Sequence, residues 1–361
     1  MGTLVADAYL EIFRGKRVLV TGHTGFKGSW LTLLLSSLGA EVMGYALAPE
    51  YAGGHFEQLC LEKQIRHVTG DVRDLYRLRQ EVAAFQPEIV FHLAAQALVR
   101  HSHVDPKTTF DVNVGGGVNL LEAVRTCESA RALVFITSDK CYENLEWIWG
   151  YRETDRMGGY DPYSASKGAA ELVFSSYLRS FFANRPDFGA ASARAGNVIG
   201  GGDWAADRIV PDCIRALQAG KPITIRSPRA TRPWQHVLEP LSGYLKLGAR
   251  LFESGHSYDG SWNFGPHVGD VRTVLDVANA IAGQFENGSV VVDEPANRPY
   301  EAHLLQLNSD KARQLLQWNT RWDFEQTLAA TSGWYKQVFV EGKPASVVSR
   351  EQISRYYGGQ L

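Results

Sequence analysis

The segment KRVLVTGHTGFKG, residues 16–28, determines the fold of this chain. Its first half is a short apolar run typical of a buried strand, and residues 26–38 follow with the pattern of a helix. Between them a glycine recurs at every third position, which permits a tight turn and lets backbone N–H groups approach a pyrophosphate. We therefore expect this loop to bind a dinucleotide, with an ordinary glycine-containing turn as the alternative. The predicted cofactor-binding residues of the loop are Gly22, His23, Thr24, Gly25, Phe26, Lys27 and Gly28.

Short apolar runs continue to alternate with helical patterns through the first half of the chain. Further strands are expected at 41–47, 64–72, 88–95, 132–138 and 190–198, and helices near 74–85, 107–128 and 162–184. Strands rich in Val, Ile and Leu, each followed by a helix, indicate an α/β fold with a Rossmann-like, doubly wound parallel sheet. Ligands of such a sheet bind at the carboxyl ends of its strands.

After about residue 196 the pattern loosens. Glycine and proline interrupt it, and only 205–219 and 270–284 still have helical patterns. We expect a smaller C-terminal lobe that covers the carboxyl ends of the strands and binds the substrate. The predicted dinucleotide-binding domain is 1–195 with return segments near 232–265 and 320–345, and the predicted substrate-binding lobe is 196–231 and 266–319.

Composition narrows the class of protein. The chain has 361 residues and a formal net charge of −2, which argues against nucleic acid as its main partner. The four cysteines are isolated in the sequence, so neither a zinc site nor a disulfide framework is expected, and a reducing compartment fits. Residues 1–15 lack the pattern of a signal peptide, and no apolar stretch approaches the ~20 residues of a membrane helix. A soluble cytoplasmic protein is expected.

Tyr163 and Lys167 lie four residues apart in the helix expected at 162–184. This spacing puts both on one helical face, where the ammonium can stabilise a phenolate. Free tyrosine has a pKa of about 10, so ionising it near neutrality requires roughly 4 kcal/mol, which a lysine and a cationic nicotinamide ring could supply. Such a pair suits the deprotonation of an alcohol whose carbon gives a hydride to NAD(P)+. The pattern is short, and a helix face with a partly exposed lysine is the alternative.

The end of the second expected strand bears on the choice of cofactor. Around residues 45–50 only Glu50 is acidic, and no arginine is present there to hold a 2′-phosphate, so NAD is preferred over NADP. Asp71 and Val72, at the end of the third expected strand, could hold the adenine amino group. A helix N-cap is the competing role for that region, although Asp74 suits the cap better.

Five motifs occur in a fixed order: the glycine loop, Asp71-Val72, Leu93-Ala94-Ala95-Gln96, Thr137-Ser138-Asp139-Lys140 and Tyr163-Ser164-Ala165-Ser166-Lys167. With them the chain resembles the extended short-chain dehydrogenases/reductases over roughly residues 16–335. Within that group it most resembles the sugar-nucleotide 4,6-dehydratases, and among these the branch that acts on CDP-glucose. The local matches are TGHTGFKGSW (21–30), TSDKCYEN (137–144), GNVIGGGDWAADRIVPD (196–212) and RPWQHVLEP (232–240). The resemblance adds Leu93, Ala94, Ala95, Gln96, Tyr163 and Lys167 to the cofactor-binding residues.

The resemblance implies a redox-neutral reaction of deoxysugar biosynthesis. Tyr163 would take the proton of the sugar 4-hydroxyl while carbon 4 gives a hydride to NAD+. Water would then leave across carbons 5 and 6, and the hydride would return to carbon 6, giving a 4-keto-6-deoxy sugar nucleotide. One hydroxyl would complete a triad with Tyr163 and Lys167; the spacing favours Ser138, and Thr137 could face the core instead.

Asp139 and Lys140 would distinguish a dehydratase from a simple dehydrogenase, because elimination needs an acid for the departing hydroxyl and a base for the carbon-5 proton. Asp139 matches the family's acid and would have to be protonated, which burial would favour. Lys140 is either a neutral amine that acts as the base or a charged group that stabilises the enolate. A surface ion pair at a strand end is the structural alternative for both.

The predicted substrate-binding residues are Gln96, Ser138, Asn197, Arg208, Arg232 and Arg298. A sugar diphosphate suits a bidentate guanidinium, and by the resemblance Arg232 is the favoured clamp, with Arg298 as a second. Arg194 lies near Asn197 in the same matched segment and could be purely structural. No metal is expected, because His101 and His103 lack further ligands.

Two other functions remain open. A sugar-nucleotide 4-epimerase would share the glycine loop, Tyr163 and Lys167 but would need no acid–base pair at 139–140. A non-catalytic dinucleotide-sensing regulator could use the same fold, although sensing requires none of Ser138, Tyr163 and Lys167. The resemblance further implies a homodimer formed through the helices near 107–128 and 162–184.

Overall fold

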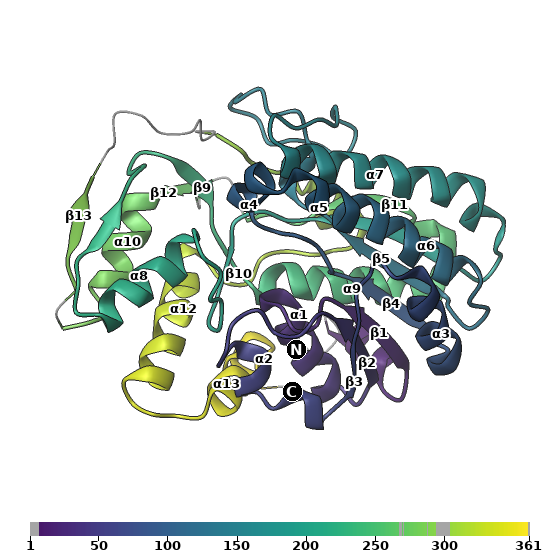
Figure 1. Cartoon of the computed structure of the whole chain (residues 1–361), viewed down its shortest axis with the longest axis horizontal. Helices are drawn as coiled ribbons and strands as arrows, with labels where there is room; N and C mark the ends of the chain where they lie inside the picture. The colour runs from purple at the N-terminus through teal and green to yellow at the C-terminus, as the bar shows by residue number, and fades with distance from the viewer. Residues whose placement is uncertain (1–6, 267–268, 270, 287, 294–303, 360–361) are drawn as a thin grey trace.

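A computed structural model describes residues 7–266, 269, 271–286, 288–293 and 304–359. It confirms the predicted α/β fold, with a central sheet of seven parallel strands in the order β11-β6-β5-β4-β1-β2-β3 (Figure 1). The strands are β1 Arg17–Thr21, β2 Glu41–Ala46, β3 Arg66–Thr69, β4 Ile89–His92, β5 Ala132–Ile136, β6 Gly189–Arg194 and β11 Gly260–Asn263. The chain leaves β1 toward β2 on one side and returns to β4 on the other, and this switch point is where ligands of open α/β sheets bind.

Helices cover both faces of the central sheet. One apolar core packs α1 Phe26–Ser37 and α9 Leu238–Ser254 against the sheet, and a second packs α3 Leu75–Phe85, α6 Gly117–Arg125 and α7 Pro162–Ser180 against the other face. The helix starts follow from local sequence, since Asp74 caps α3 by accepting from the Arg77 N–H, and Asp161 caps α7. The sheet therefore holds the strand ends, and the loops after them, in fixed positions.

A smaller group of elements lies beside the sheet, at the left of Figure 1. It contains the two-stranded pairs β8 Ile223–Ile225 with β13 Val290–Val292, and β9 Thr231–Pro233 with β12 Val271–Thr273. These pack with α8 Ile209–Gln218 and α10 Val274–Ala282, where α10 begins with a capping box between Thr273 and Asp276. The predicted boundaries between the two lobes stay a prediction.

The remaining elements connect these parts. They are η1 Ala8–Phe13, α2 His55–Gln58, η2 Leu61–Lys63, α4 Val99–Val104, α5 Pro106–Phe110, η3 Asp111–Gly116, η4 Asp139–Cys141, η5 Phe182–Asn184, β7 Val198–Ile199, β10 Gln235–His236, η6 Gly255–Tyr258, α11 Asp310–Leu315, α12 Phe324–Phe339 and α13 Ala345–Tyr356.

Three elements differ from the sequence prediction. The strand expected at 190–198 breaks, because Gly196 and the left-handed Asn197 (φ 51°) interrupt it, and β7 leaves the main sheet to pair with β10. The helix expected at 107–128 is interrupted by the π-helical turn η3. Strand β11 has the sequence GSWN, which has no apolar run to predict it.

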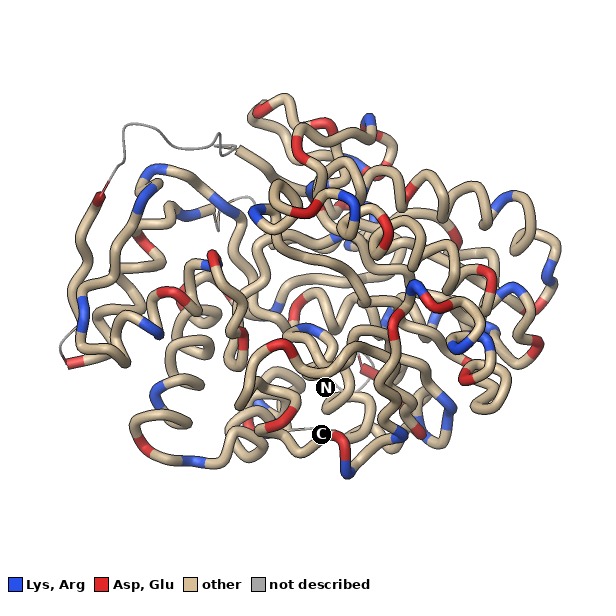
Figure 2. Tube along the Cα trace, viewed as in Figure 1, with Lys and Arg blue, Asp and Glu red and all other residues tan. Residues whose placement is uncertain are grey.

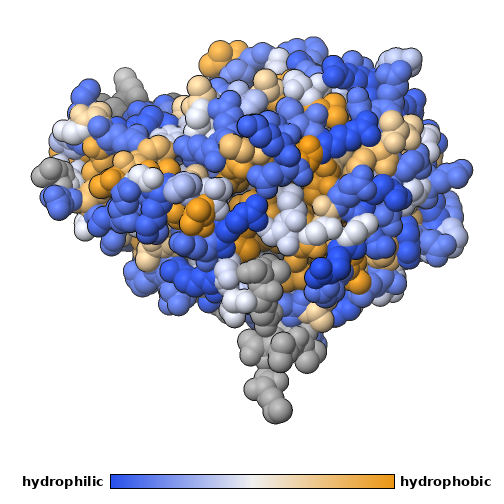
Figure 3. Space-filling model, turned by 90° about the horizontal axis from the view of Figure 1, so that it is seen from below, coloured by the Kyte–Doolittle hydropathy of each residue, from blue (hydrophilic) through white to orange (hydrophobic). Residues whose placement is uncertain are grey.

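The charges of the chain are mixed rather than grouped by sign. Figure 2 shows lysine and arginine interspersed with aspartate and glutamate along the trace, in keeping with the net charge of −2. On the face seen in Figure 3, hydrophobic residues lie scattered among hydrophilic ones. Within the described part of the chain, no helix combines the length and apolar character needed to cross a membrane.

Candidate active site

A large cavity lies at the carboxyl ends of the central strands. Its volume is about 2380 Å³. A pocket for one small molecule is usually about 300–1,000 Å³, so this cavity has room for two ligands side by side. It is lined by the glycine loop, the ends of β3, β4 and β5, the start of α7, and the chain between β6 and α8.

The glycine loop is a close-packed cradle in which Gly22 and Gly28 leave no room for a side chain. Gly22 has φ +74°, and a Cβ on it would lie 2.7 Å from the Ala94 nitrogen. A Cβ on Gly28 would lie 2.1 Å from the Gly22 carbonyl oxygen. Helix α1 begins after Gly25, which offers no side-chain cap, so its first N–H groups point toward the cavity without a side-chain partner. This cradle fits a dinucleotide pyrophosphate.

Gly28→Ala is expected to weaken NAD+ binding about 10- to 100-fold. The added methyl must displace the Gly22 carbonyl, and overpacking of this kind costs about 1–3 kcal/mol, where 1.4 kcal/mol is a factor of ten. Calorimetric titration with NAD+ measures the effect. Gly333→Ala in α12 is the matched control, since its methyl meets only the flexible end of Gln337. An unchanged affinity in Gly28→Ala would contradict this use of the loop.

Two side chains of the loop point in different directions. The His23 ring lies behind the loop, where its Nε2 and the Nδ1 of His67 are 2.7 Å apart, and burial lowers its pKa to about 3. It does not line the cavity, so its side chain cannot make the predicted cofactor contact and only its backbone could. Lys27 lines the cavity, and burial together with Arg208 lowers its pKa to about 8. Its ammonium has no ion pair in the described structure and is available to a phosphate.

The predicted adenosine side of the cavity contains Asp71 and Val72. The Asp71 carboxylate accepts from the Arg73 side chain at 2.6 Å and from the Arg73 N–H at 2.9 Å. Arg73 holds the pKa of this carboxyl below its usual range. Val72 is buried against Gly116. Both residues line the cavity, and their contact with adenine stays a prediction.

The loop after β4, which contains Leu93, Ala94, Ala95 and Gln96, also lines the cavity. The Gln96 amide is already used within the protein, donating to Leu98 O at 3.1 Å and to Thr109 Oγ1 at 2.8 Å. For the predicted contact with the substrate, the Gln96 side chain would have to give up these hydrogen bonds. Asn113, in the π-helical turn η3, buttresses this loop by accepting from the Gln96 N–H at 2.9 Å. Asn113 was not predicted, because nothing in the local sequence marks a π-turn.

The structure brings the predicted redox residues together. Tyr163 and Lys167 are both buried on α7 and both line the cavity beside Ser138. Burial raises the pKa of Tyr163 to about 12, whereas a hydrogen bond with Ser138 and the charge of Arg208 lower it. Burial lowers the pKa of Lys167 to about 8. The influence of Arg208 on the tyrosine was not predicted from the sequence.

The predicted elimination residues lie on the same cavity, directly after β5. Asp139 is buried and accepts a 2.9 Å hydrogen bond from the Ser138 hydroxyl, while the Lys140 N–H donates to Ser138 Oγ at 3.1 Å. A Cβ on Gly196 would lie 1.9 Å from Asp139 Oδ2, so a glycine is needed where β6 ends. Lys140 is half-buried. The buried Asp139 excludes the alternative of a surface ion pair.

The remaining predicted substrate residues lie in the chain after β6. Asn197, Arg208 and Arg232 all line it. Arg208 forms a 3.0 Å ion pair with Asp203, and Arg232 donates to Thr231 O at 2.8 Å. Arg298 lies outside the described residues. No group of three or more His, Cys, Asp or Glu able to hold a metal ion occurs in the described ranges.

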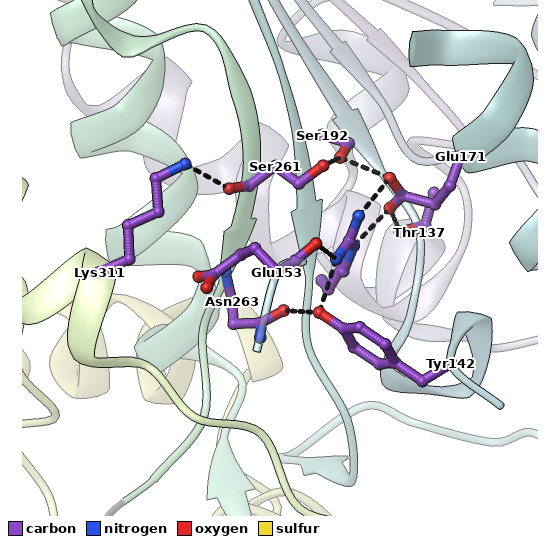
Figure 4. A network of polar contacts seen from close by, with 9 residues as sticks. Thr137, Tyr142, Glu153, Glu171, Ser192, Ser261, Asn263 and Lys311 are labelled. Carbon is purple, nitrogen blue, oxygen red and sulfur yellow. Dashed lines mark hydrogen bonds and ion pairs between the residues drawn. The ribbon is translucent and has the colours of Figure 1, made fainter. Parts of the chain in front are cut away.

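A buried polar network behind the redox residues was not predicted. Its centre is Glu171, which forms an ion pair of 2.8 Å with Arg194 (Figure 4). Arg194 in turn donates to the Tyr142 hydroxyl at 2.6 Å, which donates to Asn263. One signal for it was available, since Glu171 follows Lys167 by four residues on a face already identified.

Known proteins share both the sequence and the architecture of this chain. The model of a family described as GDP-mannose 4,6 dehydratase matches residues 19–331. CDP-glucose 4,6-dehydratase of Salmonella typhimurium is 48% identical, over 96% of this chain and 97% of that protein. UDP-glucose 4-epimerase of Rhizobium leguminosarum bv. trifolii is 27% identical, over 89% of this chain and 98% of that protein.

Solved structures extend the likeness to the whole fold. An epimerase of Methanothermobacter thermautotrophicus superposes with a TM-score of 0.80 at 25% identity, covering 94% of this chain and 98% of that one. UDP-glucose 4-epimerase of Thermus thermophilus, solved as a complex with NAD, has a TM-score of 0.74 at 26% identity, covering 89% and 99%.

Proposed function

Because the family model covers most of its length, the chain belongs to the GDP-mannose 4,6-dehydratase family, and we propose that it converts CDP-D-glucose to CDP-4-keto-6-deoxy-D-glucose and water. The enzyme is an NAD-dependent hydro-lyase. The 48% identity to a CDP-glucose 4,6-dehydratase supports the choice of nucleotide. The observation that carries the reaction type is the position of Asp139 and Lys140 on the same cavity as Tyr163 and Lys167.

The residues of the cradle fit NAD+. Backbone N–H groups of the glycine loop and the ammonium of Lys27 would hold the pyrophosphate, and Asp71 and Val72 would face the adenine. When bound, NAD+ would supply reversible hydride transfer, from carbon 4 of the sugar and later to carbon 6. The rest of the chemistry is proton transfer and positioning, which this chain's own residues perform.

Tyr163 is the base for the 4-hydroxyl. Ser138 lies beside the phenol and lowers its pKa, and Arg208 supplies positive charge near the oxygen that must ionise. The charged Lys167 is buried on the same helix face and favours the phenolate form. Together these groups hold the sugar oxygen beside the tyrosine and take its proton.

Asp139 and Lys140 perform the elimination once carbon 4 is a ketone. Lys140 takes the acidified carbon-5 proton and returns it to carbon 5 when the hydride reaches carbon 6. Asp139 gives a proton to the departing 6-hydroxyl, which leaves as water. Asp139 is buried and hydrogen-bonded to Ser138, which supports the proposal that it acts at the reacting end of the sugar.

Arg208, Arg232 and Asn197 are the proposed contacts of the diphosphate, with Arg298 as a further one. A guanidinium can bind two phosphate oxygens at once, which suits this ligand.

The proposed assembly is a homodimer that pairs α6 and α7 with their copies. Leu172 in the middle of α7 and Phe181 directly after it are 63% and 44% exposed and support it. The cytoplasmic location stays a prediction.

An epimerase is the second candidate, supported by the 27% identity to a UDP-glucose 4-epimerase. Epimerisation needs the redox residues alone, because no bond to oxygen breaks at carbon 6. Asp139 and Lys140 would then have no task. Their placement on the cavity favours the dehydratase.

Incubation of the protein with CDP-glucose and NAD+ tests the proposal, with dTDP-, UDP- and GDP-glucose as controls. The expected product has lost one water by mass, forms from CDP-glucose alone, and appears without net NADH. Conversion to an isomer of unchanged mass would indicate the epimerase. No reaction with any sugar, despite NAD binding, would indicate the non-catalytic sensor.

A further inference from the structure

Glu171 is a buried acid close to the redox residues that the proposed reaction does not use. It lies on α7 one helical turn after Lys167 and two turns after Tyr163, on the same face. Its side chain is 3% exposed. A carboxylate in such a position requires partners for both oxygens.

The partners of Glu171 come from β6 and from the residue directly after β5. Thr137, the residue before Ser138, donates to Oε1. From β6, Ser192 donates to Oε2 at 2.7 Å, and Arg194 donates to both oxygens at 2.9 and 2.8 Å. Figure 4 shows Thr137 and Ser192 beside the Glu171 carboxylate. The contacts join the helix of Tyr163 and Lys167 to the segment after β5 that carries Ser138 and Asp139.

A contribution to stability alone does not account for this ion pair. Glu171 and Arg194 are 3% and 2% exposed, so both charges have lost their water. An apolar pair of equal volume is often at least as stable as a buried ion pair. The buried charge of Glu171 is therefore better explained by an effect on the neighbouring redox residues than by stability.

The ionisable groups around Lys167 give that explanation. Buried Cys141, from η4, has its pKa raised well above the usual value by burial and is a neutral thiol. Burial lowers the pKa of His92, on β4, to about 3, so that ring is also neutral. Lys27, from α1, is a cation and opposes a second positive charge. Burial lowers the pKa of Lys167, and Glu171 is the anion that opposes the decrease.

We propose that Glu171 is a positioning residue that keeps Lys167 charged and fixes the helix of the redox pair to the segment after β5 that carries the elimination pair. Arg194 limits the effect of Glu171 by balancing most of its charge. The role of Lys167 in this inference rests on the proposed function, whereas the charge coupling between Glu171 and Lys167 does not.

Two single variants test the coupling, because they should act in opposite directions. Glu171→Gln removes the anion and leaves Arg194 uncompensated, so Lys167 should lose its proton at a pH lower by about one unit. Arg194→Gln leaves the Glu171 charge uncompensated, so Lys167 should hold its proton to a higher pH. The double variant should return close to the wild type. A purely structural defect would not reverse its sign between the two variants.

Two readouts separate this inference from the proposed function. The first is the protonation of Lys167 followed by 15N NMR of labelled lysine without substrate, with the signal assigned by Lys167→Arg. The second is the pH at which turnover of CDP-glucose falls on the alkaline side, where Lys167 loses its charge. Both should shift to lower pH in Glu171→Gln and to higher pH in Arg194→Gln.

Glu88→Gln is the matched control, because Glu88 pairs with Lys16 and Arg17 at the opposite end of the sheet. It should shift neither readout. If Glu171→Gln does not fold, the direction of the pH shift in Arg194→Gln still tests the coupling. Shifts of the same sign in both variants, or no shift, would overturn the inference. A wild-type enzyme inactive on every sugar nucleotide, but with the NMR shifts as expected, would overturn the proposed function and leave the coupling intact.

Discussion

Replacing Tyr163 with phenylalanine is expected to lower the turnover of CDP-glucose by about 10²–10⁴-fold, the usual contribution of a general base. Phenylalanine keeps the ring and its packing but has no oxygen to take the proton of the 4-hydroxyl. Affinity for NAD+ should be unchanged, because the pyrophosphate cradle at Gly22 and Gly28 is separate from this hydroxyl. Single-turnover formation of the keto sugar, followed by mass, measures the loss.

The ionisation of Tyr163 explains why the loss should be large. Its pKa is raised to about 12 by burial, so in the protein alone the phenol is neutral at pH 7. Five units of pKa correspond to about 7 kcal/mol, which is more than the roughly 4 kcal/mol expected for a solvated tyrosine. The value of about 12 already includes the effect of Arg208, so Lys167 and the positive nicotinamide ring of bound NAD+ must together supply this energy. We therefore expect proton removal to occur only when cofactor and sugar are both bound.

Tyr76→Phe on α3 is the matched control, since that tyrosine is 74% exposed and lies off the cavity. It should leave turnover and stability unchanged. Near-normal turnover in Tyr163→Phe, with the NAD+ affinity retained, would remove the base role from this residue. Loss of folding in Tyr163→Phe would instead appear as a lowered melting temperature.

The parts of the site that the sequence could predict are those set by local spacing. Glycines at every third position indicate the cradle, and the interval of four residues puts Tyr163 and Lys167 on one helix face. The end of a buried strand puts Ser138 and Asp139 at the ligand-binding edge. In each case a few neighbouring residues determine the geometry.

The parts that the sequence could not predict depend on contacts between distant segments. Arg194 and Glu171 are 23 residues apart and meet only because β6 pairs beside β5 under α7. His23 follows a glycine in the loop, yet its ring turns away to His67 from β3. The break of the strand after Arg194 depends on Asp139, which occupies the space that a side chain at 196 would need. Such features follow from packing rather than from periodicity.

Asp139→Asn is expected to slow the loss of water by about 10²–10³-fold and to slow the oxidation of carbon 4 much less. An amide cannot give a proton to the departing hydroxyl, whereas the base for oxidation, Tyr163, remains. Asparagine has the same shape, so the close contact with Gly196 is preserved. Because oxidation continues while the hydride cannot return, NADH should accumulate on the enzyme, where the wild type shows none. Rapid mixing with CDP-glucose, monitored by NADH absorbance and by product mass, measures both steps.

The control and the contrary result both rest on the separate roles of two pairs of residues, Tyr163 with Lys167 in oxidation and Asp139 with Lys140 in elimination. Asp187→Asn changes an exposed carboxylate away from the cavity and should leave both steps unchanged. If Asp139→Asn slows oxidation and water loss equally, with no NADH signal, then Asp139 orients Ser138 for the redox step instead of acting as the acid. The 2.9 Å hydrogen bond that Ser138 donates to Asp139 would explain that outcome, because it couples the two side chains directly. Accumulated NADH would assign Asp139 to elimination, because only a block after oxidation and before hydride return leaves the cofactor reduced.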